Sequence, residues 1–447
     1  MLKFYLQIVG VITLMTAINL PLSSKEGKIF PYDYKVKTLD NGLKVYVIPM
    51  ASEGLASYYT IVRTGSVDEV EEGKTGFAHF FEHMMFRGTK KYPKTVYDSI
   101  VVSLGADANA YTTDDYTCYH LNIATEDLER VIDIESERFQ HLSYLKPDFQ
   151  TESGAVYGEY RKNLTIPIEN LITELVATAF KVHTYGHTTI GYEADIKDMP
   201  NQYEYSKEFY KRFYRPENCV IVVCGDVNSD KTFKMIEEYY GNWEKGYQKP
   251  NIPTEPQQTE PRRSTFKYPG KTNPMIAIGY KGETFDPANK NVIATQLLGQ
   301  LAFGSSSEIS KKLYVKEGKV LEIAPSFEMN RFPALWLIYA ILQDANDLTY
   351  VENEILNTVK QFQETLVSKD ALDKLKSKLK YSFIMSMDTP DATAGNIARF
   401  IAITGGIEGI ETMYKTMDTI TPEDIRNAAK KLTDNIKTTV TMIEEAK

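Results

Sequence analysis

The chain has 447 residues, of which 43% are hydrophobic and 25% are charged, and its formal net charge is −9. This composition is typical of a globular protein that is long enough to build more than one hydrophobic core. The negative charge argues against a nucleic-acid-binding protein, because binding to phosphates needs clustered Lys and Arg side chains. It would suit basic peptide substrates, although a solvated acidic surface is the simpler explanation. Three cysteines are too few for a disulfide scaffold.

An apolar run at the N-terminus extends from about Phe4 to Leu20, follows Lys3 and ends at Pro21. We therefore expect residues 1–24 to be a secretory signal peptide, which places the protein in a periplasm or outside the cell. An uncleaved membrane anchor is the alternative, because a run of about 17 apolar residues is at the lower limit for spanning a bilayer. A eukaryotic organelle stays open as a destination. No cysteine lies in this run, so a lipid-anchored protein is not expected.

The most informative motif is His79-Phe80-Phe81-Glu82-His83, for which the flanking residues predict a helix. Residues at i and i+4 lie one above the other on a helix, so both imidazoles can reach a common point and Glu82 lies beside it. This H-x-x-E-H order is the inverse of the commoner H-E-x-x-H zinc signature. A core helix with two hydrogen-bonded histidines is the alternative interpretation.

A catalytic zinc usually has three protein ligands and leaves one position for water, so a third ligand must come from elsewhere in the chain. Lys146-Pro147-Asp148 is typical of a helix start, and the helix predicted after it carries Glu152 and Glu159. Seven residues make about two turns, so the two carboxylates lie on one face of that helix. From the residues alone, two solvated glutamates are the simpler interpretation.

Two other segments need an interpretation. Residues 109–112 precede a run of strand-like composition from Tyr116 to Ile123, and an ordinary β-hairpin is the simplest interpretation of the pair. His183 and His187 form a second i, i+4 pair, but glycine and threonine around them favour a loop. We interpret these two histidines as structural, because histidines more often satisfy local hydrogen bonds than bind metal. His120 and His141 have no partner at ligand spacing and receive the same interpretation.

A polar stretch with four prolines between Pro250 and Pro261 predicts a linker over residues 247–270. It would separate an N-terminal domain, residues 25–246, from a C-terminal domain, residues 271–447. Each side repeats a coarse order of strands, helices and strands, with a strand expected near residues 275–280 in the second half and near 58–63 in the first. Helical periodicity recurs over 348–366 and 371–387. We therefore expect two α+β halves, each a sheet backed by helices.

Together these features resemble the pitrilysin and mitochondrial processing peptidase family of zinc endopeptidases, in the form with two homologous halves per subunit. The resemblance covers nearly the whole chain after the leader and rests on residues 76–89, 109–112, 183–187 and 214–218 and on Glu152 and Glu159. It implies that each half is a mainly antiparallel sheet backed by helices. It also implies that the halves close like a clam around a chamber, and that only the first half carries the metal.

The resemblance also implies roles for the site residues. His79, His83 and Glu159 would hold one Zn²⁺, Glu82 would be the general base, and Glu152 would support the site from behind the ligands. This agrees with zinc chemistry, because zinc lowers the pKa of bound water towards ~7 and a nearby carboxylate can then take the proton. Ligating imidazoles also normally donate their second N–H to an acceptor, a role that suits Glu152.

Asn109, Ala110 and Tyr111 would lie on an edge strand that pairs with the backbone of a peptide substrate. Strand addition of this kind recognises an extended peptide through main-chain hydrogen bonds and reads side chains only weakly. The resemblance therefore implies peptides or unfolded polypeptides as substrates.

The second half departs from the family pattern. Active single-subunit relatives carry an Arg and a Tyr seven residues apart that polarise the substrate carbonyl, whereas Tyr314 and Leu321 align with those positions and Glu308 stands where relatives often have Arg. Losing one such donor typically costs ~10²–10³ in rate. Our hypothesis is that a homologous subunit without metal supplies the Arg/Tyr pair. A self-sufficient homodimer and a non-catalytic assembly subunit are the alternatives, and the intact ligand set counts against the latter.

Overall fold

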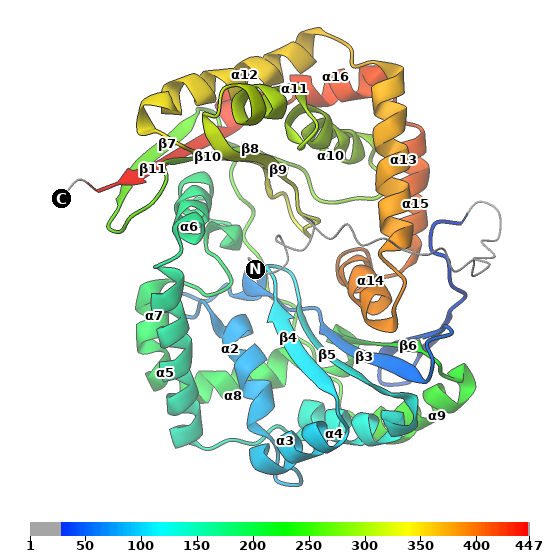
Figure 1. Ribbon diagram of the computed structural model, residues 1–447. Coiled ribbons are helices and arrows are strands. Elements are labelled where there is room, and N and C mark those ends of the chain that lie inside the picture. The colour runs from blue at the N-terminus through cyan, green and yellow to red at the C-terminus, as the bar shows by residue number, and fades with distance from the viewer. Residues whose placement is uncertain (1–27, 446–447) are drawn as a thin grey trace.

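The structure is a computed structural model that describes residues 28–445, so the expected signal peptide lies outside the described residues. Two α+β halves, each with one sheet backed by helices, stand one above the other (Figure 1). This confirms the expected fold class. In the part of the chain that the structure describes, no helix is long and apolar enough to cross a membrane.

The first half contains a six-stranded sheet with the order β1-β2-β6-β3-β5-β4. All neighbouring strands are antiparallel except β2 and β6. The central strand β6 is a continuous apolar run that is buried along its whole length, as expected for a strand covered on both faces. The elements are, in chain order, β1 (Lys35–Thr38), β2 (Lys44–Pro49), β3 (Leu55–Val62), α2 (Phe77–Met84), α3 (Lys94–Ser103), β4 (Asp107–Thr112), β5 (Thr117–Ala124), α4 (Leu128–His141), α5 (Lys146–Asn163), α6 (Pro167–Ala179), α7 (Glu193–Asp198), α8 (Tyr203–Phe213), β6 (Cys219–Gly225) and α9 (Ser229–Tyr240).

The second half contains a five-stranded sheet with the order β7-β11-β8-β10-β9, in which only β7 and β11 are parallel. Helices α12 and α13 confirm the two periodic segments predicted in this half. The elements are β7 (Arg262–Tyr268), β8 (Met275–Lys281), α10 (Lys290–Phe303), α11 (Glu308–Ser310), β9 (Val320–Ser326), β10 (Leu335–Leu342), α12 (Leu348–Glu364), α13 (Lys369–Met385), α14 (Pro390–Thr404), α15 (Glu408–Asp418), α16 (Pro422–Lys430) and β11 (Lys437–Glu444).

The two halves share one topology. Without β1, the sheet order β2-β6-β3-β5-β4 of the first half has the same strand directions as β7-β11-β8-β10-β9 of the second. The helices follow the same chain order, so α2 corresponds to α10, α5 to α13 and α6 to α14. The edge strand β4 therefore corresponds to β9.

The expected linker is shorter than the sequence indicated. Residues 247–261 contain neither helix nor strand, but Arg262–Tyr268 form β7, which pairs with β11 along its whole length. The second half therefore begins at Arg262 and not at residue 271. The alternating exposure of β7 follows the period of a strand, and the polar residues and prolines just before it concealed this pattern.

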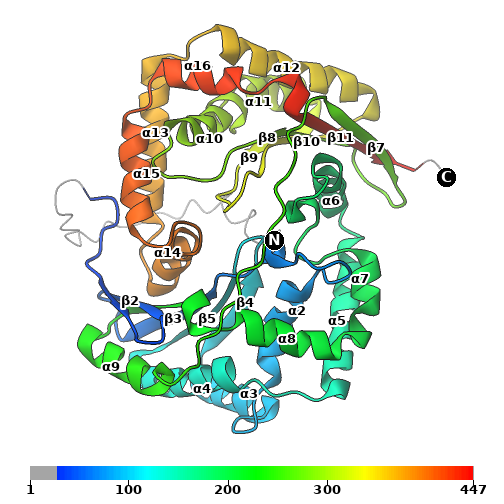
Figure 2. The ribbon, with the colours of Figure 1, turned by 180° about the vertical axis from the view of Figure 1, so that it is seen from behind.

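One helix of each half packs on the sheet of the other half. Helix α14 lies against β3 and β6 of the first sheet, and helix α6 lies against β7, β8 and β11 of the second (Figures 1 and 2). At the start of the described chain, the backbone N–H groups of Ile29 and Phe30 donate to Glu411 on α15 at 2.8 and 2.9 Å. The halves are therefore interlocked at several places and are not joined by the linker alone.

Candidate metal centre

Helix α2 carries the H-x-x-E-H motif and is fixed by its apolar face. Phe80 packs edge-on against Phe149 of α5, and Phe81 stacks on Phe209 of α8, each with ring centroids 5.0 Å apart. Both phenylalanines are fully buried, whereas His79, Glu82 and His83 are only partly buried. The helix therefore turns its polar side towards α5 and β4.

The N-terminus of α2 is held by a buried carboxylate. Glu69, which is 2% exposed, accepts hydrogen bonds from the backbone N–H groups of Gly76 at 2.7 Å and Ala78 at 2.6 Å. It thereby satisfies donors that the first turn of a helix leaves free. Burial raises the pKa of the Glu69 carboxyl well above its usual value, and the two backbone donors oppose this rise. Gly76 has a φ of +89°, and a Cβ there would lie 2.4 Å from a side-chain carbon of Ile196.

The structure brings His79, His83 and Glu159 together. Glu159 Oε2 lies 3.7 Å from His79 Nε2 and 3.5 Å from His83 Nε2. Two ligand atoms of one tetrahedral zinc ion, each about 2.1 Å from the metal, lie about 3.4 Å apart, so this geometry fits zinc. Among residues 28–445, these three form the one group of His, Cys, Asp or Glu side chains that could hold a metal ion.

The protonation of this group also fits a zinc site, because zinc binds neutral imidazole and ionised carboxylate. Burial lowers the pKa of His79, which keeps its imidazole neutral near neutral pH. The hydrogen bond with His83 is the main cause that lowers the pKa of the Glu159 carboxyl. His79 Nδ1 is buried, and no described residue is hydrogen-bonded to it.

Glu152 lies directly behind His83. Its Oε1 is 2.9 Å from His83 Nδ1, and its other oxygen forms an ion pair with Arg87. A proton on Nδ1 that is donated to Glu152 leaves the Nε2 lone pair free for a metal and fixes the orientation of the ring. Glu152 therefore contacts a candidate metal ligand from behind, as the resemblance implied.

Glu82 faces a pocket that reaches the edge strand β4. Its Oε2 accepts a hydrogen bond from Thr112 Oγ1 at 2.7 Å, which ties it to the end of that strand. Asn109 and Ala110 line this pocket together with Glu82, His83, Phe86, Arg87, Lys94 and Glu152.

The side chain of Tyr111 lies on the face of β4 opposite to Ala110 and Thr112. Its ring packs against that of Tyr116 with centroids 5.9 Å apart, and it is not among the residues that line the pocket. Among the described strands, β4 is the last of its sheet and pairs with β5 alone. The second edge of such a strand presents N–H and C=O groups that can pair with a peptide backbone.

Three of the other histidines contact groups outside the cluster of His79, His83 and Glu159. His183 Nδ1 accepts a hydrogen bond from the backbone N–H of Tyr185 at 3.1 Å, and His187 Nδ1 lies 3.0 Å from the carbonyl of Thr188. Both side chains lie at a short 3-10 helix and not on an α-helix, as the interpretation as structural residues requires. The ring of His120 stacks on Tyr59.

The three positions that depart from the family pattern lie at the surface of the second half. Glu308 begins α11 and Leu321 belongs to β9, with Tyr314 between them. All three side chains are exposed, and none of them lines the pocket beside Glu82.

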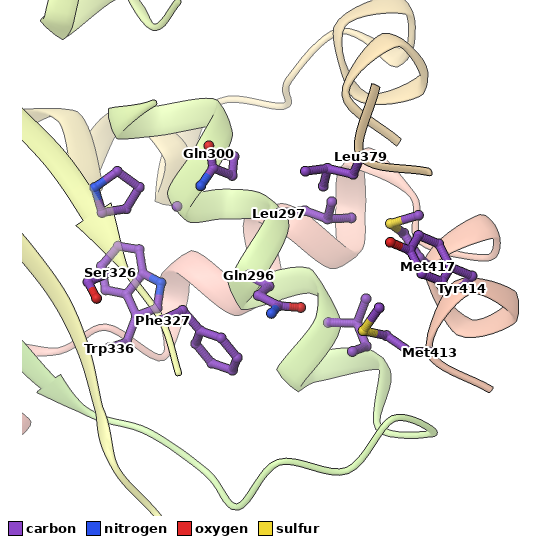
Figure 3. A pocket seen from close by; sticks show the side chains of 13 residues that line it. Gln296, Leu297, Gln300, Ser326, Phe327, Trp336, Leu379, Met413, Tyr414 and Met417 are labelled. Carbon is purple, nitrogen blue, oxygen red and sulfur yellow. The ribbon is translucent and has the colours of Figure 1, made fainter. Parts of the chain in front are cut away.

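A second cavity lies in the second half between α10, β9, β10, α13 and α15 (Figure 3). It occupies the position that the pocket beside Glu82 has in the first half, because α10, β9 and α13 correspond to α2, β4 and α5. Gln296, Gln300 and Leu379 are among its 13 lining residues, none of which is His, Cys, Asp or Glu. This cavity therefore has no ligands for zinc.

Three residues of the site were not assigned a role from sequence. Glu69 holds the start of α2, Arg87 binds Glu152, and Thr112 binds Glu82. Arg87 and Thr112 belong to the motifs on which the family resemblance rests, and those motifs could have indicated that the two residues lie at the site. No sequence pattern indicated Glu69, because its partners are backbone groups that only the fold brings near.

Comparison with known proteins gives matches over most of the chain. Residues 50–193 match the family described as Insulinase (Peptidase family M16), and residues 202–379 match the domain described as Peptidase M16 inactive domain. A zinc protease of Helicobacter pylori, PqqE, is 28% identical over 412 residues, which cover 90% of this chain and 91% of that protein. A probable mitochondrial-processing peptidase subunit beta of Schizosaccharomyces pombe is 23% identical over 407 residues, which cover 88% of each chain.

Solved structures show the same architecture. A crystal structure of a protease from Helicobacter pylori superposes with a TM-score of 0.85 at 26% identity and covers 92% of this chain and 99% of that one. The structure of the periplasmic protease PqqL from Escherichia coli gives a TM-score of 0.74 at 20% identity, and the match covers 93% of this chain and 48% of that chain. The described halves are therefore the two domains of this fold.

Replacing Glu152 with Gln tests the support of the metal ligands. We expect Glu152→Gln to weaken zinc binding about 10- to 100-fold, because the imidazole of His83 loses its charged acceptor. Competition with a chelator of known affinity measures the change. Asp148→Ala, which removes the side-chain acceptor for the backbone N–H of Leu145 at the start of the same helix, is the control for a loss of helix stability. Equal zinc affinity in Glu152→Gln and the wild type would contradict the role of Glu152.

Proposed function

This chain belongs to peptidase family M16, and on that premise we propose that it is a zinc-dependent endopeptidase that hydrolyses extended peptides or unfolded polypeptides. The observation that carries the proposal is the meeting of His79, His83 and Glu159 beside a carboxylate that faces an open pocket. The family matches support a metallopeptidase, and several relatives are zinc proteases.

The three ligands would hold one zinc ion per subunit and leave a position open towards the pocket. Bound zinc supplies an activated water and a positive charge beside the substrate carbonyl. Glu82 is the general base: it takes a proton from the attacking water and passes it to the amine that leaves. Thr112 donates to Oε2 of Glu82, so Oε1 is the oxygen that carries this proton.

Substrate binds to β4 by strand addition. Asn109 and Ala110 line the pocket beside Glu82, so a peptide paired with their backbone passes close to the metal ligands. Tyr111 contributes through its backbone in this arrangement, because its side chain packs against Tyr116, on the face of the sheet opposite to Ala110. Recognition through main-chain groups makes the enzyme tolerant of substrate sequence.

A second, homologous subunit supplies the Arg/Tyr pair that this chain lacks. Tyr314 and Leu321 stand at the corresponding positions, and neither offers a cationic donor for the oxygen of a tetrahedral intermediate. A relative that is named as a beta subunit supports an assembly of different chains. The alternative is a self-sufficient homodimer that uses other donors.

Export to a periplasm is proposed from the apolar leader at residues 1–24. A structural relative is described as a periplasmic protease, which supports this location. A membrane anchor formed by the same segment is the alternative.

Glu82→Gln tests the proposed reaction. We expect this variant to lose at least about 10²-fold in turnover of an unstructured peptide, because it cannot accept the proton. Its zinc content should stay equal to that of the wild type, since Glu82 is not a ligand. The control is Glu72→Gln, which changes an exposed carboxylate in the loop before α2. Unchanged turnover in Glu82→Gln would show that another group is the base.

Purifying the chain alone tests the need for a partner. We expect peptide cleavage by the zinc-loaded chain to be about 10²- to 10³-fold slower than by its complex with a homologous subunit that carries Arg and Tyr. Mass measurement by light scattering gives the oligomeric state of each sample. Full activity of the chain as a monomer or homodimer would remove the reason for a partner and favour the alternative.

A further inference from the structure

A loop of the second half contacts two buried carboxylates of the first half. This loop joins β9 to β10, and the side chain of Arg331 extends from it. Its Nη2 donates to Asp68 Oδ2 at 2.6 Å, and its Nε donates to Asp115 Oδ1 at 3.0 Å. The carboxylates are 1% and 3% exposed, and the Arg331 side chain is 16% exposed. One guanidinium therefore bridges two buried carboxylates of the other half.

Neighbouring groups hold the bridge in place. Asp115 also accepts hydrogen bonds from the Asn330 side-chain amide at 3.0 Å, from the Arg331 backbone N–H at 3.3 Å and from the Tyr185 hydroxyl at 2.7 Å. The backbone N–H of Phe332 in turn donates to the same hydroxyl of Tyr185. Three consecutive residues of the loop are thus bonded to the first half.

Each carboxylate belongs to a segment that positions part of the site. Asp68 immediately precedes Glu69, whose carboxylate accepts hydrogen bonds from backbone N–H groups at the start of α2. Asp115 lies in the turn between β4 and β5, three residues after Thr112, which holds Glu82. Arg331 therefore joins the segment that fixes the metal ligands on α2 to the segment that fixes the general base and the edge strand.

The two segments are in close contact. The backbone N–H of Val67 donates to the carbonyl of Asp114 at 2.9 Å. A Cβ added to Gly65 would lie 2.4 Å from the same carbonyl oxygen, so the chains approach closely at this point. A shift of one segment is therefore transmitted to the other, and the guanidinium sets how the two carboxylates are spaced.

We propose that Arg331 is a positioning residue for the candidate metal centre. Through Arg331, the second half fixes the spacing between α2 and β4. This spacing in turn sets the position of Glu82 relative to the zinc ion and the peptide substrate. This inference rests on the proposed function. The planar guanidinium suits the task because it donates to two carboxylates at once in a fixed geometry. A lysine ammonium is a point charge on a flexible stem and would pair well with only one of them.

Replacing Arg331 with Met and with Lys tests the inference in the zinc-loaded complex. We expect Arg331→Met to lower kcat about 10- to 100-fold with KM changed by less than about twofold, because a misplaced base slows the chemistry and leaves the peptide strand bound. Arg331→Lys should lie between Met and the wild type. Zinc content should not change, since the three ligands on α2 and α5 are intact.

Hydrogen–deuterium exchange of the metal-free protein gives a readout that does not depend on activity. In Arg331→Met and Arg331→Lys, we expect faster exchange in residues 76–84 and 107–117, with α12 exchanging as in the wild type. The control is Arg263→Met, which removes an ion pair between β7 and α12 within the second half. We expect it to keep the kcat and the exchange of α2 and β4 of the wild type.

Two results would overturn the inference. One is a wild-type kcat with unchanged exchange in α2 and β4 in Arg331→Lys and in Arg331→Met. The other is an equal rise of exchange in α12, which would show general destabilisation. If Arg331→Met does not fold, Arg331→Lys decides by the same measurements. If the wild type cleaves no peptide, the proposed function fails, but the exchange pattern still tests the coupling.

Discussion

The packing of α2 against α5 is the contact on which the site depends. Neither helix alone supplies three ligands, and the edge-on contact between Phe80 and Phe149 sets the two helices side by side. This contact brings Glu159 within 3.7 Å of His79 and 3.5 Å of His83. It also places Glu152 behind His83. A buried aromatic contact thus helps to place the three candidate ligands close together.

The sequence predicted the parts of the site that depend on local spacing. The i, i+4 histidines and the helix that starts at Lys146 follow from helical geometry, and both helices are present. Glu69 and Arg331 could not be predicted, because their partners lie in segments that only the tertiary fold brings together. The face of the Tyr111 side chain could not be predicted either, since alternation along a strand fixes which residues share a face and only the fold shows which face meets the pocket. Strand β7 was missed because the prolines before it resemble a linker.

The cross-packing of the halves explains why a half without metal is retained in the fold. Helix α14 covers one face of the first sheet, and α6 covers one face of the second, so neither half can bury its sheet alone. The cavity between α10, β9 and α13, which corresponds in position to the pocket beside Glu82, is lined by no residue that could bind zinc. The second half therefore supports the first through its packing and through the loop that carries Arg331.

The most direct test of the account is the zinc stoichiometry and coordination of the purified chain. Elemental analysis should find one zinc ion per chain after loading, lost on treatment with a chelator and regained on adding zinc. The extended X-ray absorption fine structure of the bound zinc should show two imidazole nitrogens together with oxygen ligands. The variant Glu159→Gln should bind zinc much more weakly than the wild type. A folded chain that stays free of metal in excess zinc, or an unchanged affinity in Glu159→Gln, would contradict the account.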